Sequence, residues 1–273
     1  MTIETARFWN SRLEWIEENN RYEIRDVIGP DEYKEHVDNN AYTNYMAHEN
    51  MRLAAQVIAC IRDEKKDIYG KMQKLMQEEG TSLEQLEEEL KDKMKKLYLP
   101  QPDEKTGIIP QFDGYFDLKE IDLSVYKNAS VVGTIFHDYS GEDVQGMQAG
   151  KQADIVELLY QMEDITTPDN KAKNYVYYEA RTLHDSSLSK AIHSITACDL
   201  GMEKEAYDMF MSAALTDLGQ EMKSSDAGIH SANMGGVWQD VVMGFGGIRI
   251  RDGHLRIAPN CPKQWEKFTY PLY

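Results

Sequence analysis

One segment of the sequence, residues 27–44, gathers carboxylates, amides and aromatic side chains directly after a rigid Gly29-Pro30 turn. A carboxyl group beside Tyr33 and Tyr42 in a partly desolvated loop would have its pKa raised, which is what a general acid near neutral pH requires. The aromatic rings could also form walls for the apolar face of a sugar. Composition alone favours a solvated acidic loop instead. Spacing does not choose among the carboxylates that compete for the acid role: Asp31, Glu32 and Glu35.

Two further clusters precede predicted helices. In residues 181–189, Ser186 or Ser187 is a natural N-cap, and helix initiation is the simplest interpretation. Hydroxyls and free amides at a helix N-terminus also make a ready anion site, especially for phosphate. Residues 228–236 place glycines close together, which lets the backbone approach a ligand, but they match neither the P-loop nor the dinucleotide fingerprint.

Other catalytic and metal patterns are not matched. His184, Asp185 and Ser187 have the residue types of a hydrolase triad, but they are nearly adjacent and lack a nucleophile elbow. The histidines show no HExxH spacing and no other ligand pattern, so no metal is expected. Three separated cysteines in no CxxC arrangement argue against a disulfide framework and favour a reducing compartment.

Apolar residues at helical spacing predict a chain that is helical to about residue 246. A capping box formed by Thr81 and Glu84 predicts the start of one helix, and Gly201 a hinge between two others. Lys151 and Gln152 open another helix, ordinarily as a solvated first turn, although such a junction could point them at a ligand. Residues 164–170 are expected to be a turn. The remaining predicted helices cover residues 2–18, 45–76, 151–162, 187–199, 203–218 and 236–245.

The pattern changes after residue 246. Apolar residues alternate with charged ones around Asp252-Gly253, which predicts a β-hairpin. Because a hairpin and a short tail cannot make a stable sheet domain alone, the C-terminus is expected to be truncated. Helices joined alternately by short turns and long polar loops indicate a layered or toroidal all-α domain.

Length and charge limit the class of protein. The 273 residues, 41% of them hydrophobic, suffice for one large domain or two modest ones. A net charge of −17 disfavours nucleic-acid binding by a basic surface, and a small neutral substrate fits better. The sequence has neither a signal peptide nor a long apolar run, so no membrane contact and a cytoplasmic location are expected.

Taken together, three parts of the sequence resemble glycoside hydrolase family 65, the family of inverting disaccharide phosphorylases acting on maltose, trehalose, kojibiose or nigerose. These parts are residues 28–44, residues 151–154, and residues 181–189 with 228–239. In order and separation they look like the second half of that family's catalytic domain. The resemblance implies an all-α fold, a partial (α/α)6 barrel over residues 1–246, followed by the truncated start of a C-terminal β domain over residues 247–273.

The resemblance also implies roles for individual residues. Glu32 would be the general acid that protonates the glycosidic oxygen, and Lys151 and Gln152 would contact the glucosyl unit. Attack by phosphate on the opposite face of the ring would give β-glucose 1-phosphate and a free sugar, with phosphate as co-substrate and no other cofactor. The phosphate would be held by four side chains: Ser186, Ser187, His230 and Ser231.

Two alternatives remain open at this point. An inverting α-glucoside hydrolase would need a second carboxylate to activate water, whereas phosphate is already a nucleophilic anion. The chain could also be an inactive fragment of such an enzyme, because half a helical barrel exposes large apolar faces. The resemblance suggests a homodimer in the full-length form, and it does not name the disaccharide.

Overall fold

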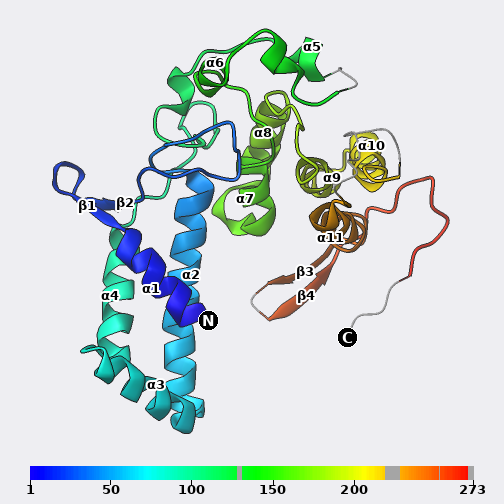
Figure 1. The fold of residues 1–273 in the computed structure, drawn as a ribbon. Coiled ribbons are helices and arrows are strands. Elements are labelled where there is room, and N and C mark those ends of the chain that lie inside the picture. Colours follow the sequence, from blue (N-terminus) through cyan, green and yellow to red (C-terminus); the bar gives the residue numbers. More distant parts are fainter. Residues whose placement is uncertain (128–130, 219–227, 252, 270–273) are drawn as a thin grey trace. The chain divides into compact units, whose positions relative to one another are not determined.

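The computed structural model describes residues 1–127, 131–218, 228–251 and 253–269 (Figure 1). The chain forms two compact units. Unit 1 comprises Met1–Gly29, His36–Gln101 and Gln111–Asp113, and unit 2 comprises Pro30–Glu35, Pro102–Pro110 and Gly114–Tyr273. Within the described residues, no helix has the length and apolar character needed to cross a membrane.

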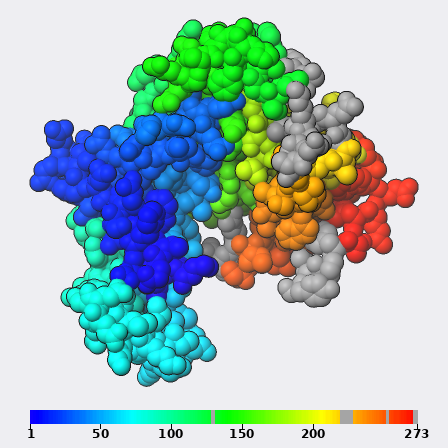
Figure 2. Space-filling view, viewed as in Figure 1, coloured from blue at the N-terminus to red at the C-terminus, as the bar shows by residue number. Residues whose placement is uncertain are grey.

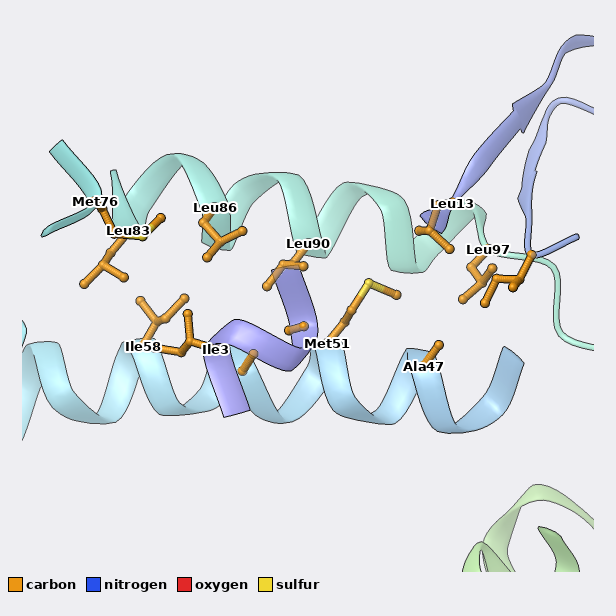
Figure 3. Close-up of a cluster of buried hydrophobic side chains, with 13 residues drawn as sticks. Ile3, Leu13, Ala47, Met51, Ile58, Met76, Leu83, Leu86, Leu90 and Leu97 are labelled. Carbon is orange, nitrogen blue, oxygen red and sulfur yellow. The ribbon is translucent and has the colours of Figure 1, made fainter. Parts of the chain in front are cut away.

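Unit 1 is built from helices that enclose one apolar core. Its elements are α1 (Thr2–Arg12), β1 (Glu14–Ile16), β2 (Arg21–Glu23), α2 (Ala41–Glu64), α3 (Lys66–Glu78) and α4 (Leu83–Lys96). Figure 3 shows Met51 and Ile58 of α2 facing Leu86 and Leu90 of α4. Full burial of one such side chain contributes roughly 1.5–3 kcal/mol. The short β1–β2 hairpin protrudes from the rest of unit 1 in the space-filling view (Figure 2).

The boundaries in unit 1 differ from the sequence prediction at three points. The first helix ends at Arg12 instead of residue 18, because the chain turns into β1. The predicted helix 45–76 is two helices, α2 and α3, which break at Lys65 (φ −132°, ψ 59°). Ser82, not Thr81, caps α4, and its Oγ accepts a hydrogen bond from the backbone N–H of Gln85 (3.1 Å).

Unit 2 is also mostly helical. Its elements are α5 (Ser124–Lys127), α6 (Gly141–Gln145), α7 (Ile155–Gln161), α8 (Pro168–Glu179), α9 (Ser189–Asp199), α10 (Glu203–Ala214), α11 (Ser231–Gln239), the π-helix Asp240–Phe245, β3 (Ile248–Arg251) and β4 (His254–Ile257). Short 3-10 turns lie at Tyr115–Asp117, Thr134–His137 and Glu163–Ile165, and Glu17–Asn19 forms another in unit 1. Helix α9 packs against α7, α10, α11 and the π-helix (Figure 1).

Helix α8 was not predicted, and its first residues lie in the predicted turn 164–170. Thr167 caps it, accepting from the Asn170 N–H (3.2 Å), and Pro168 occupies the first helical position. The prediction that Ser186 or Ser187 caps the following helix, α9, is wrong. That helix begins at Ser189 after Leu188, which makes no side-chain cap.

The hairpin prediction is confirmed. Strands β3 and β4 pair antiparallel, with Ile248 opposite Ile257. Asp252 of the predicted turn lies outside the described residues. Gly247, which precedes β3, has φ 59°, and a Cβ there would lie 1.8 Å from the carbonyl oxygen of Ala258. Only glycine fits where these two chain segments meet.

Candidate active site

Residues Pro30–Glu35 form a loop of unit 2, the acid loop, which is anchored by the buried side chain of Lys34. The Lys34 Nζ donates to the carbonyl oxygens of Val144 (2.7 Å), Gln145 (3.1 Å) and Met147 (2.5 Å). Three acceptors match the three donors of an ammonium group. Burial lowers the pKa of Lys34 to about 8. The lysine therefore ties the acid loop to the end of α6.

The structure separates the three competing carboxylates. Asp31 is buried, and its Oδ1 accepts from the backbone N–H groups of Lys151 (2.8 Å) and Tyr33 (3.2 Å). Glu32 and Glu35 are exposed, and the Glu32 Oε2 lies 2.8 Å from the Lys151 Nζ. With 57% of its side chain exposed, Glu32 lies in the solvated surroundings that composition alone favours for this loop, and not in the partly desolvated ones of the alternative interpretation. Asp31 holds the backbone, whereas Glu32 faces solvent beside a candidate sugar-binding lysine.

Residues 150–151 lie alongside residues 181–185, which lead into the loop of Ser186 and Ser187. The backbone N–H of Gly150 donates to the carbonyl oxygen of Arg181 (2.8 Å). The backbone N–H of Leu183 donates in turn to the carbonyl oxygen of Gly150 (2.8 Å). The N–H of Asp185 donates to the carbonyl oxygen of Lys151 (3.0 Å). Two segments that are thirty residues apart in sequence are thus brought together by backbone hydrogen bonds.

A side-chain hydrogen bond joins the acid loop to Asp185, in the segment that precedes Ser186 and Ser187. The Tyr33 hydroxyl donates to Asp185 Oδ2 (2.7 Å), while Asp185 Oδ1 accepts from the Gly133 N–H (2.9 Å). Burial, together with the neighbouring Asp185, raises the pKa of Tyr33, so the hydroxyl stays a donor. A Cβ at Gly150 would lie 3.1 Å from Asp31 Oδ2, so glycine favours this close approach. The acid loop, residues 150–152 and residues 181–185 form one connected structure.

Gln152 also faces the acid loop. Its Nε2 donates to the Pro30 carbonyl oxygen (2.6 Å), whereas its Oε1 is buried and has no hydrogen-bond partner among the described residues. A buried acceptor left unpaired costs about 1–3 kcal/mol. Beside Lys151, this side chain therefore offers an open acceptor suited to a sugar hydroxyl.

Ser186 and Ser187 lie in the loop directly after Asp185, and both are half-buried. The Ser186 Oγ accepts from the Leu188 N–H (3.3 Å), a turn inside the loop rather than a helix cap. The connection through Asp185 brings these serines to the same part of unit 2 as Lys151 and Glu32.

His230 and Ser231 lie at the start of α11. The His230 Nδ1 is 2.7 Å from Asp217 Oδ1, and the His230 N–H donates to Asp217 Oδ2 (2.9 Å). Helices α9 and α11 touch near Ala191 and Gly236, since a Cβ at Gly236 would lie 3.1 Å from that of Ala191. Within the described residues, however, no hydrogen bond joins His230 or Ser231 to the two serines.

The sequence analysis missed three residues that shape this region: Lys34, Glu179 and Asp217. Lys34 stands among charged residues, so nothing in the sequence marks it as buried. Asp217 lies thirteen residues before its histidine, and no local spacing links them. Glu179, His184 and His193 offer ligand atoms within 4.8 Å of one another, the one such group found in the described part of the chain. Glu179 precedes His184 by five positions, and no common metal-site spacing contains them.

Comparison with known proteins gives the family. The sequence model of the glycosyl hydrolase family 65 central catalytic domain matches residues 1–239. This chain belongs to glycoside hydrolase family 65.

Individual relatives are similar over almost the whole chain. Kojibiose phosphorylase of Halothermothrix orenii is 46% identical over 271 residues, covering 99% of this chain and 34% of the relative. Nigerose phosphorylase of Lachnoclostridium phytofermentans is 34% identical, covering 98% of this chain and 36% of the relative. A solved structure from the human microbiome, provisionally named a kojibiose phosphorylase, superposes with a TM-score of 0.83 at 30% identity, covering 97% of this chain and 37% of that one. This chain spans about a third of the length of these relatives.

Proposed function

We propose that this chain carries the general acid and the phosphate-binding residues of an inverting α-glucoside phosphorylase. The observation that carries the proposal is the connected structure at Glu32, Lys151 and Asp185, which brings the acid loop beside the loop of Ser186 and Ser187. The family membership and the phosphorylases among its relatives support it.

In the proposed reaction, Glu32 donates its proton to the glycosidic oxygen as the bond from that oxygen to the anomeric carbon breaks. A phosphate oxygen forms the new bond from the opposite face, which inverts the anomeric centre and gives β-glucose 1-phosphate and a free sugar. Lys151 and Gln152 bind hydroxyls of the glucosyl unit. Because phosphate is itself the nucleophile, the reaction needs no second carboxylate as base and no cofactor besides this co-substrate.

The proposed phosphate site combines two loops. The hydroxyls of Ser186 and Ser187 donate to phosphate oxygens from the loop before α9, and His230 and Ser231 donate from the start of α11. With a net charge of −17, the chain offers no attractive overall field, so these local donors supply the binding.

The proposed architecture is a partial (α/α)6 barrel formed by residues 1–246, followed by the first part of a β domain at residues 247–273. Its support is the helical content of both units, the end of the family match at residue 239, and the β3–β4 hairpin that follows. For the whole protein we propose a homodimer that acts on a disaccharide of the kojibiose, nigerose or maltose type.

The test measures glucose 1-phosphate and free glucose from a panel of α-linked glucose disaccharides, with and without phosphate. Two proteins are assayed: the chain alone, and a chimera in which it replaces the matching segment of the Halothermothrix orenii enzyme. We expect phosphate-dependent β-glucose 1-phosphate from the chimera. Glu32→Gln should lower kcat at least about 100-fold, the usual worth of a general acid.

Glu35→Gln is the matched control, because Glu35 is an exposed carboxylate on the same loop. It should retain activity within a few-fold. An equal loss in both variants would remove Glu32 from the acid role. Glucose release that does not depend on phosphate would favour the hydrolase, and a folded chimera without turnover would favour the inactive fragment.

A further inference from the structure

A buried charge cluster lies next to the loop of Ser186 and Ser187. Glu179, the last residue of α8, has only 17% of its side chain exposed. Its carboxylate is 2.8 Å from the Lys127 Nζ, 3.1 Å from the His184 Nε2 and 2.5 Å from the His193 Nδ1. His193 is fully buried, and neither its Nδ1, although close to Glu179, nor its Nε2 makes a hydrogen bond among the described residues. One carboxylate thus gathers three basic side chains from separate parts of unit 2.

The charge states follow from these contacts. Burial acts to raise the pKa of Glu179, but the contacts with His193 and His184 outweigh it and hold that pKa below its ordinary range. Burial lowers the pKa of His184 to about 4, so this imidazole is neutral near pH 7. A neutral His184 donates its Nε2 hydrogen to Glu179, which leaves Nδ1 to accept from the Ser189 hydroxyl (2.8 Å).

Glu179, His184 and His193 could together hold a metal ion, but the structure favours a structural role for this cluster. The Lys127 ammonium already neutralises the carboxylate, and a divalent cation would have to be placed beside that positive charge. The His184 Nε2 is hydrogen-bonded to the carboxylate itself, and the His193 Nδ1 lies close to the same carboxylate, so neither nitrogen is directed at a separate ion position. The cluster is therefore best described as an anchor in which Lys127 and His184 hydrogen-bond to Glu179 and His193 packs against it.

This anchor holds both ends of a short loop. His184 is the residue before the loop and adopts φ 58°, a left-handed conformation that costs about 1–3 kcal/mol for a residue other than glycine. Its ring reaches Glu179 on one side and Ser189, the first residue of α9, on the other. The ring thus bridges the residues that flank positions 185–188, and Asp185 is held in addition by Tyr33 and Gly133.

We propose that Glu179 is a positioning residue for phosphate binding: through His184 it fixes the loop 185–188 so that Ser186 and Ser187 face a common anion. The proposal rests on the proposed function for what the loop binds. Glu179 itself touches no substrate. Its effect comes from removing the freedom of the loop before phosphate arrives, so that less conformational entropy is lost on binding.

The first test is hydrogen exchange of the chain, measured peptide by peptide by mass spectrometry, and it does not require activity. Glu179→Gln should speed exchange of the peptide that covers residues 184–189 at least tenfold, while peptides of α10 change less than twofold. Ser189→Ala, which removes the other contact of His184 and leaves Glu179 in place, should act on the same peptide. An unchanged loop, or an equal rise throughout unit 2, would overturn the proposal.

Glu87→Gln is the matched control. Glu87 is also a buried carboxylate that contacts two cations, Arg62 and Lys91, but it belongs to α4 in unit 1. It should leave exchange of residues 184–189 unchanged. A comparable rise in that peptide would mean that the effect is a general loss of stability.

The second test uses the active chimera described above. Glu179→Gln should raise the KM for phosphate at least tenfold while the KM for disaccharide stays within about twofold, and Glu87→Gln should change neither. Equal changes of both constants would overturn the positioning role. An unsubstituted chimera without phosphorolysis would count against the proposed function, and hydrogen exchange would still decide whether Glu179 orders the loop.

Discussion

Asp240 at the start of the π-helix is a buried carboxyl group that the proposed reaction does not use. It is fully buried, and both of its carboxyl oxygens lack a hydrogen-bond partner among the described residues. Burial raises its pKa to about 8. The nearby Ser194 hydroxyl acts to lower this pKa, but its effect is smaller than that of burial. That hydroxyl donates its hydrogen to the carbonyl oxygen of Ala206 (2.7 Å) and not to Asp240. The group is therefore protonated in the folded chain at neutral pH.

This raised pKa links stability to pH. Between about pH 4 and pH 8 the folded chain keeps the Asp240 proton while the unfolded chain has lost it, so the free energy of unfolding falls as pH rises through this range. Four pH units at about 1.4 kcal/mol each set a ceiling of roughly 5–6 kcal/mol. The uncharged, nearly isosteric Asp240→Asn should lose this contribution.

The assay is urea unfolding of the chain and of Asp240→Asn at pH 5 and pH 8, followed by circular dichroism. The unsubstituted chain should be less stable at pH 8, and the variant should lose most of that difference. A smaller slope remains, because burial also raises the pKa of Glu157 to about 7. Asp164→Asn, at an exposed carboxylate, should keep the original pH profile. Identical slopes in the chain and in Asp240→Asn would refute the reasoning.

Two more outcomes follow from contacts described above. Asp217→Asn should raise the KM of the chimera for phosphate about tenfold and leave that for disaccharide nearly unchanged, because a charge-assisted hydrogen bond that orients His230 is lost; equal effects on both constants would contradict this. Gly247→Ala should lower stability by at least about 2 kcal/mol in urea unfolding, because the new Cβ would meet Ala258 in a left-handed backbone conformation. A variant as stable as the parent would show that this contact relaxes freely.

The helical content of the fold could be predicted from the sequence because periodic apolar residues report directly on packed helix faces. The hairpin after residue 246 could be predicted because apolar and charged residues alternate there, with the period of two that is typical of β-strands. Boundaries were harder. The break at Lys65 has no proline or glycine beside it, and the aromatic residues of α8 follow a turn signal, Thr167-Pro168, which is also a helix start.

The residues of the candidate site could be predicted from sequence motifs, but their arrangement in space could not. Residue types indicated a carboxylate acid, but only tertiary contacts distinguish buried Asp31 from exposed Glu32. The roles of Lys34 and Glu179 depend on partners more than forty residues away, Val144 and Lys127 respectively, and no local pattern encodes such pairs.

The acid loop is a six-residue excursion: the chain leaves unit 1 at Gly29, contributes Pro30–Glu35 to unit 2, and returns to unit 1 at His36. Neither unit is therefore encoded by one continuous stretch of gene. A recombination point between two relatives anywhere from residue 36 to residue 143 would take Lys34 from one parent and residues 144–147 from the other, and the backbone carbonyls there accept from the Lys34 ammonium only where both parents give that segment the same conformation. Exchange of whole modules by a single crossover is thus constrained by the anchoring of this one lysine.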